Sequence, residues 1–133
     1  LEDLKSITMK GSSGQAQIAA IIDSLRKDRP MGLKLGKRSV TGIIDYETQE
    51  SLGSASFPAL SKLPRSNVIQ LILEPEGKLT IRPSGTEPKV KLYSSLRHTG
   101  ALKDGRDLDI ARKELDDELA SVAGLFLAHA GLA

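Results

Sequence analysis

The sequence of 133 residues suits one domain of common size, and its 39% hydrophobic and 27% charged residues are typical of a soluble globular protein. No apolar run approaches the ~20 residues that span a bilayer, so no membrane segment is predicted, and the lack of cysteine excludes a disulfide framework and a thiolate metal site. A formal net charge of +2 and four aromatic residues argue against a nucleic-acid binder. The lack of cysteine also favours an intracellular, cytoplasmic location.

The polar opening of the chain lacks the basic and apolar regions of a signal peptide and does not begin with Met, so we interpret the sequence as a piece of a longer protein. An amphipathic helix is predicted over residues 12–27, because apolar residues follow at helical spacing, namely Ile18, Ile21, Ile22 and Leu25. Ser12 and Gln15 have the spacing of a capping box, and Pro30 marks the stop.

A first strand is predicted over residues 37–46, where β-branched residues follow Gly36. The polar residues 47–66 come next and are predicted to form one long loop. Loops of that length often have a function.

Three further strands are predicted in the segments NVIQLILEP, KLTIR and KVKLY, the first two joined as a hairpin by the turn EPEG. The period of two places one set of side chains toward the core: Ile69, Leu71, Leu73, Leu79, Ile81, Val90 and Leu92. The same period points Lys89, Lys91 and Tyr93 outward, where Tyr93 is either a packing residue against a neighbouring domain or an edge aromatic.

A second long helix is predicted from Asp107 onward, on the spacing of Leu108, Ala111, Leu115, Leu119, Val122 and Phe126. The acidic residues Glu114, Asp117 and Glu118 fall opposite this stripe, so we interpret them as a solvated face and not as paired catalytic carboxylates. The order of elements predicts an α+β, two-layer domain, with a four-stranded antiparallel sheet and both helices on its apolar face.

The two histidines, His98 and His129, are too few for a metal triad, and we predict a catalytic role for neither. No residue of this chain is therefore predicted to be catalytic or to bind a metal.

The stretch IRPSGTEPKVKLY contains a loop with the composition of an anion-binding site. Arg82 and Lys89 flank it, Ser84 and Thr86 offer hydroxyl donors, and Gly85 admits the positive φ with which successive backbone N–H groups form a nest. A wide hairpin turn of the same composition is an equal alternative. The spacing matches neither a P-loop nor a GxGxxG motif.

The string RPSGTEPKVKLY resembles the phosphate-binding signature of the α-D-phosphohexomutase superfamily, the phosphoglucomutases and phosphomannomutases, in their C-terminal fourth domain. Upstream, LPRSNVIQLILEPEGKLTI is similar to the preceding strand pair, and LKSITMKGSSGQAQIAAIIDSLR resembles the junction into that domain and its first helix. The resemblance makes residues 1–133 the fourth domain, with residues 1–10 as the junction from the preceding one.

The resemblance implies a TATA-box-binding-protein-like fold and a phosphate-gripping role for Arg82, Ser84, Gly85, Thr86 and Lys89. The parent enzyme would move a phosphoryl group between C1 and C6 of a hexose phosphate through a phosphoserine and a bisphosphate intermediate. Its implied partners are glucose or mannose 1- or 6-phosphate, the hexose bisphosphate, and the other domains of the parent chain.

No segment of this sequence resembles the family's phosphoserine loop, its Asp-rich metal loop DGDGD or its sugar-reading Gly-Glu-Met-Ser loop. Mg²⁺ is therefore expected in the missing domains, and the isolated domain is predicted to be inactive. Because the resemblance places sugar choice in another domain, glucose and mannose both stay open.

Two other functions compete with this interpretation. One is a freestanding phosphate- or phosphosugar-binding module. The other is a nucleic-acid binder, which we disfavour because Glu87, Asp45 and Glu74 are expected to interrupt the positive charge of the open sheet face.

Overall fold

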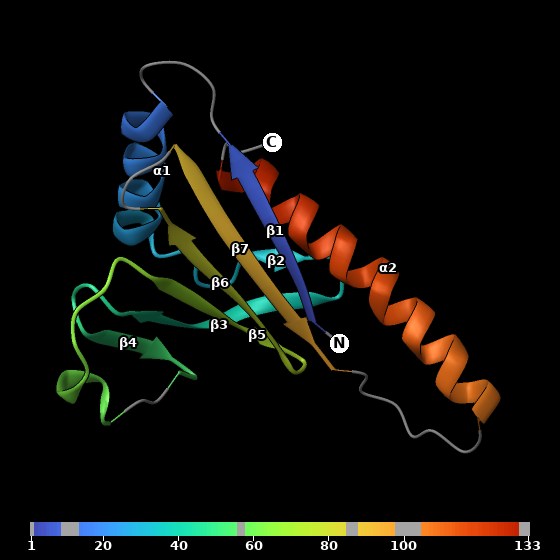
Figure 1. Ribbon diagram of the computed structural model, residues 1–133. Coiled ribbons are helices and arrows are strands. Elements are labelled where there is room, and N and C mark those ends of the chain that lie inside the picture. Colours follow the sequence, from blue (N-terminus) through green and yellow to red (C-terminus); the bar gives the residue numbers. More distant parts are fainter. Residues whose placement is uncertain (1, 9–13, 56–57, 85–87, 98–104, 131–133) are drawn as a thin grey trace.

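The computed structural model describes residues 2–8, 14–55, 58–84, 88–97 and 105–130. One antiparallel sheet carries two helices on the same face (Figure 1). The strands are β1 (Glu2–Thr8), β2 (Lys34–Leu35), β3 (Arg38–Asp45), β4 (Glu50–Gly53), β5 (Ile69–Glu74), β6 (Gly77–Pro83) and β7 (Lys89–Leu96). The helices are α1 (Gly14–Asp28), α2 (Gly105–Ala130) and the short 3-10 helix η1 (Leu60–Lys62). No helix of the described residues is long and apolar enough to cross a membrane.

The strand order is β1-β7-β6-β5-β3-β2, and β4 pairs with β3 off this path. The predicted strands correspond to β3, β5, β6 and β7, and the predicted helices correspond to α1 and α2. The predicted capping box lies partly outside the described residues.

The described residues form seven strands, so the prediction of a four-stranded sheet was wrong. β1 has the polar sequence EDLKSIT, β2 is two residues long, and β4 lies in the segment predicted as one loop, residues 47–66, together with η1. None of the three has the apolar alternation that predicts a strand. Each is held by backbone pairing to a stronger strand, β1 to β7 and both β2 and β4 to β3, and local sequence does not report such pairing.

The core lies between the sheet and the two helices. All seven sheet residues predicted to point inward are 0% to 2% exposed, which confirms the register of β5, β6 and β7. They form one cluster with Ile18, Ile22 and Leu25 of α1 and with Leu119, Val122, Ala123 and Phe126 of α2. Both helices therefore cover the apolar face, as predicted, and they do not cover the opposite face of β6 and β7.

An ion pair fastens α1 to the end of β3. Arg26 Nε donates to Asp45 Oδ2 at 2.7 Å, and the backbone N–H groups of Glu47 and Thr48 donate to Asp45 Oδ1 at 2.9 and 3.3 Å. Asp45 is 7% exposed and pairs with a helix on the core side, so the prediction that it interrupts the open sheet face was wrong. Burial alone would raise the pKa of Asp45, but these hydrogen bonds outweigh it and hold the pKa below its ordinary value of 3.8.

We expect Asp45→Asn to lower the free energy of unfolding at pH 7 by about 2 kcal/mol, because charge-assisted hydrogen bonds are lost. A carboxyl group whose pKa is lower in the folded state than in the unfolded state stabilises the fold at pH values above its unfolded-state pKa. This stabilisation is lost as the pH falls through the folded-state pKa. The difference between wild type and variant should therefore shrink as the pH drops below 3.8. Urea unfolding between pH 7 and pH 3 measures this, with the exposed Asp23→Asn, from the surface pair with Lys27, as the control. A difference that is constant with pH would contradict the assignment.

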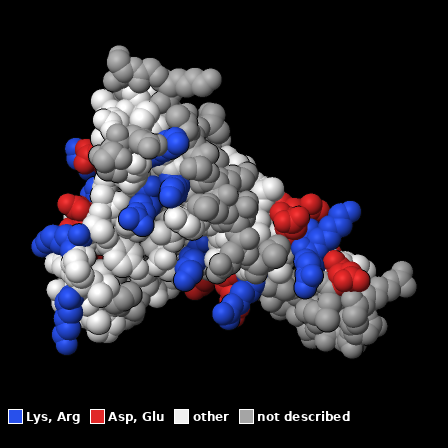
Figure 2. Space-filling model, in the orientation of Figure 1, with Lys and Arg blue, Asp and Glu red and all other residues white. Residues whose placement is uncertain are grey.

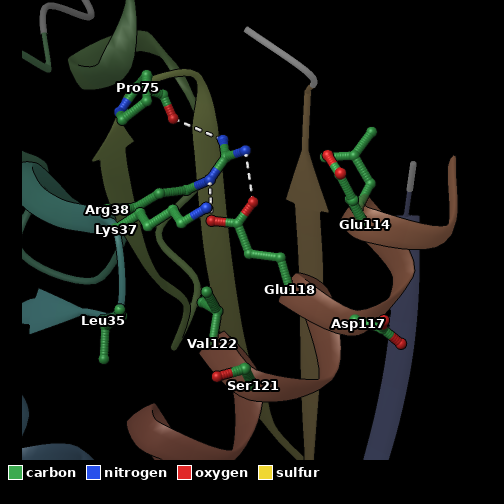
Figure 3. A pocket seen from close by; sticks show the side chains of 11 residues that line it. Leu35, Lys37, Arg38, Pro75, Glu114, Asp117, Glu118, Ser121 and Val122 are labelled. Carbon is green, nitrogen blue, oxygen red and sulfur yellow. Dashed lines mark hydrogen bonds and ion pairs between the residues drawn. The ribbon is translucent and has the colours of Figure 1, made fainter. Parts of the chain in front are cut away.

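A second ion pair joins β3 to α2 (Figure 3). Arg38 is 4% exposed, and its guanidinium donates to both carboxylate oxygens of Glu118, at 2.8 and 2.9 Å. It also donates to three backbone carbonyls, those of Pro75, Glu76 and Arg97, at 2.6, 2.5 and 2.8 Å. Arg38 thus ties together the start of β3, the β5–β6 turn, the residue after β7, and α2.

The prediction of a solvated acidic face on α2 holds for Glu114 and Asp117, which are exposed, and was wrong for Glu118. Glu118 lies one residue from the buried Leu119, at the edge of the apolar stripe, where a carboxylate can reach across to the sheet.

Candidate functional site

The RPSGTEPK loop joins β6 to β7, which are neighbours inside the sheet and not at its edge. The ladder pairs Pro83 with Val90, and the Ser84 N–H donates to the Lys89 carbonyl at 2.8 Å. Residues 85–88 alone stand between these closing partners. Two predicted site residues, Gly85 and Thr86, lie outside the described residues, as does Glu87. The loop therefore connects two adjacent interior strands of the sheet, and the pairing of these strands fixes both of its ends.

Three cations stand beside this loop on one face of the sheet. Arg82 of β6 and Lys91 of β7 are Cα partners in the ladder, and Lys89 is two residues from Lys91. All three are exposed, whereas the alternating residues Ile81 and Val90 are each 1% exposed and point into the core. Figure 2 shows Lys and Arg side chains gathered over β6 and β7.

Sequence reasoning selected Arg82 and Lys89 and did not select Lys91. The outward position of Lys91 was readable from the period of two, but its position directly opposite Arg82 depends on the register of two strands joined by an irregular loop. The structure therefore extends the candidate site along β7, away from the loop.

Polar side chains continue across the same face from the cations. Gln70 of β5 donates its amide to the Thr80 hydroxyl of β6 at 2.9 Å, and Thr80 is the ladder partner of Tyr93. Tyr93 is 38% exposed, so its ring is open to solvent beside the candidate site. This polar, partly aromatic face suits a hydroxyl-rich ligand or another protein surface.

A groove of about 720 Å³ lies on the other side of the molecule, between α2 and the start of β3 (Figure 3). Its apolar lining residues include Leu35, Leu115 and Val122, and its charged lining residues are Lys37, Arg38, Glu114, Asp117 and Glu118. The buried Arg38 and the partly buried Glu118 pair with each other. Within the groove, the Arg38–Glu118 pair therefore forms a structural junction between β3 and α2.

The described residues contain no group of three or more His, Asp or Glu side chains that could hold a metal ion. His129 is exposed in the last turn of α2, and His98 lies outside the described residues.

Comparison with known proteins identifies relatives of one kind. No family model matches the chain. It is 40% identical over 95 residues to the phosphoglucomutase of Staphylococcus haemolyticus, a match of 68% of this chain and 16% of that protein. It is 39% identical over 98 residues to a Staphylococcus aureus phosphoglucomutase and 38% identical over 99 residues to one from Staphylococcus epidermidis, matches of 72% and 71% of this chain and 17% of each relative. The chain is thus homologous to a segment of phosphoglucomutases, which confirms the resemblance stated for the sequence.

Proposed function

We propose that this chain is the substrate-phosphate-binding domain of a phosphoglucomutase or phosphomannomutase. The parent enzyme moves a phosphoryl group between C1 and C6 of a hexose phosphate through a phosphoserine and a bisphosphate intermediate. The observation that carries the proposal is the display of Arg82, Lys89 and Lys91 on one face, beside the loop that closes between Ser84 and Lys89. Homology to a segment that makes up a sixth of known phosphoglucomutases supports it.

In the proposed mechanism this domain holds the phosphate that does not react. Arg82 presents a planar fork to two phosphate oxygens, and Lys89 adds a second positive charge from the start of β7. Ser84, Gly85 and Thr86 supply hydroxyl and backbone N–H donors. A phosphate held at this point fixes one end of the sugar, so the other end reaches the reacting groups in a defined orientation.

The remaining machinery belongs to other domains of the proposed parent, where we place the phosphoserine and the Mg²⁺ that neutralises charge during phosphoryl transfer. This chain then has no catalytic residue of its own and is inactive in isolation. Its partners are glucose or mannose 1- or 6-phosphate, the hexose bisphosphate and those other domains. The proposal includes a cytoplasmic location, a TATA-box-binding-protein-like fold and the absence of nucleic-acid binding.

We expect the isolated chain to bind glucose 1-phosphate weakly, with a dissociation constant on the order of 1 to 10 mM, because a few charge-assisted hydrogen bonds in water must offset the immobilisation of the ligand. Titration of the ¹⁵N-labelled chain should move the amide signals of Arg82, Ser84 and Lys89. The charge-removing variant Arg82→Ala should reduce these shifts, and Lys78→Ala, at the far end of β6, should not. If amide signals shifted elsewhere in the chain while those of residues 82–89 did not, the phosphate-binding interpretation would be wrong and the loop would be a simple turn.

The same titration separates the proposal from its alternative, a freestanding phosphosugar-binding module. Such a module has to bind without help from other domains, so its affinity for a phosphosugar would be micromolar or tighter. Millimolar affinity favours the domain of a larger enzyme, because partner domains would supply the missing contacts.

A further inference from the structure

β1 lies at the edge of the sheet, where it has a single partner strand. It pairs with β7 along seven residues and with no other strand of the part of the chain that the structure describes. On its other side, β7 pairs with β6 along seven residues as well. If β1 left the sheet, β7 would therefore still have a complete partner strand.

Different interactions hold the two strands in place. The inner residues of β7, namely Val90, Leu92, Ser94 and Leu96, are 0% to 2% exposed, and the three apolar ones belong to the core cluster between the sheet and the helices. β1 has the sequence EDLKSIT, which offers little apolar surface for burial. Burial thus holds β7, whereas β1 depends mainly on backbone hydrogen bonds to β7. Segments of this second kind open locally at a lower free energy than the core.

The register connects β1 with the lysines of β7. Thr8 is the ladder partner of Lys89, and Ser6 is that of Lys91. When β1 leaves, the segment of β7 that bears both lysines keeps backbone partners on the β6 side only. The position of this segment then depends on one neighbouring strand in place of two.

We propose that β1 is a separable strand, which leaves β7 while the rest of the domain stays folded, and that its departure lowers the affinity for the phosphosugar. The second part rests on the proposed function, since it concerns the same ligand. In the proposed parent, residues 1–10 form the junction from the preceding domain, so a movement of that domain acts first on β1 and through it on β7. β1 thus transmits the position of the preceding domain to the ligand-binding surface.

Hydrogen exchange of the ¹⁵N-labelled chain tests both parts, without ligand and with glucose 1-phosphate at about ten times its dissociation constant. Without ligand, the amides that pair β1 with β7 should exchange on the order of 100-fold faster than those that pair β5 with β6. If the ligand binds only when β1 is in place, it should slow the β1 amides about tenfold. The slowest core amides exchange through global unfolding, so any ligand of the folded state slows them by the same factor, and they serve as the internal control.

A second experiment removes the pairing of β1 by substitution. Backbone N–H groups along a strand point alternately to its two sides, so one of two adjacent prolines always removes an N–H from the β1–β7 ladder. The double variant Lys5→Pro with Ser6→Pro should keep the amide signals of α1, α2 and the β5–β6 hairpin in place. It should bind glucose 1-phosphate about tenfold more weakly than the control Lys5→Ala with Ser6→Ala, which should bind like wild type.

The outcomes separate the two parts of the proposal. Exchange of the β1 amides at the rate of the β5–β6 amides, or a proline variant that unfolds as a whole, would show that β1 belongs to the same cooperative unit and would overturn the inference. If the ligand slowed only the core amides, or if the proline variant bound like wild type, the transmission from β1 to the ligand would be wrong. If glucose 1-phosphate moved no signal of residues 82–89, the proposed function would fail, and ligand-free exchange would still decide whether β1 is separable.

Discussion

Replacing Arg38 with alanine is expected to lower the free energy of unfolding by about 3 to 5 kcal/mol, the range typical when one partner of a buried ion pair is removed. The variant loses both bonds to Glu118 and the Arg38 bonds to the carbonyls of Pro75, Glu76 and Arg97, of which the Glu76 carbonyl still accepts from the Arg97 N–H. These four groups lie in three segments that are far apart in the sequence: the β5–β6 turn, the residue after β7, and α2. The loss should therefore loosen the packing of α2 on the sheet as well as lower stability.

Urea unfolding at neutral pH measures this effect. Lys37→Ala is the matched control, because Lys37 is the exposed neighbour of Arg38 and its removal should stay within about 0.5 kcal/mol. Glu118→Gln keeps an oxygen acceptor for Arg38 and should cost less than Arg38→Ala. An Arg38→Ala variant as stable as Lys37→Ala would show that the buried pair and its three carbonyl contacts contribute nothing net.

In the parent enzyme that we propose for this domain, a hexose phosphate mutase, Arg82→Ala is expected to lower kcat/KM on the order of 100-fold. If Arg82 binds the non-reacting phosphate as proposed, loss of its guanidinium weakens that binding and raises KM. It also lowers kcat, because binding energy at a remote group is used to orient the reacting end of the substrate. Steady-state kinetics at several substrate concentrations separates the two parameters.

Lys78→Ala is again the control, because Lys78 is an exposed cation of the same strand, β6, and pairs with Ser95 far from the loop. It should leave both parameters near the wild-type values. If Arg82→Ala raised KM and left kcat unchanged, the phosphate contact would contribute binding alone and not orientation. Unchanged kcat and KM would refute the phosphate-binding role of Arg82.

The elements that could be predicted from the sequence are those whose buried residues recur at a regular spacing. β5, β6 and β7 alternate strictly, and α1 carries apolar residues at helical spacing, so the core facing both helices could be predicted almost residue by residue. β1 and β4 carry no such signal, because their place in the sheet comes from backbone pairing with distant strands. Likewise, Arg38 and Glu118 are eighty residues apart, and each looks like an ordinary surface charge in its own segment.

The loop of the candidate site could be predicted from its sequence motif, whereas the residues beside the loop follow from the register of β6 and β7. Arg82 and Lys89 could be selected from sequence because the motif includes them, and the role predicted for them stays a prediction. Lys91 could not be selected, since its relation to Arg82 depends on how many residues the loop leaves unpaired. The number of unpaired loop residues is set by the hydrogen bond between Ser84 and Lys89, which cannot be predicted from local sequence propensities.

The pairing of β1 with β7 also has a consequence for how the chain folds. Glu2 is the ladder partner of Ser95, and Thr8 that of Lys89, so β1 pairs with a strand that follows it more than eighty residues later in the sequence. Before β1 and β7 pair, the hairpin of β5 and β6 can form alone, because its pairing is local. Closing so long a loop is slow compared with hairpin formation, and β7 presents an open edge to other chains in the interval. Docking of β1 covers this open edge of β7, the strand that bears Lys89 and Lys91, and we expect it to follow the formation of the local β5–β6 hairpin.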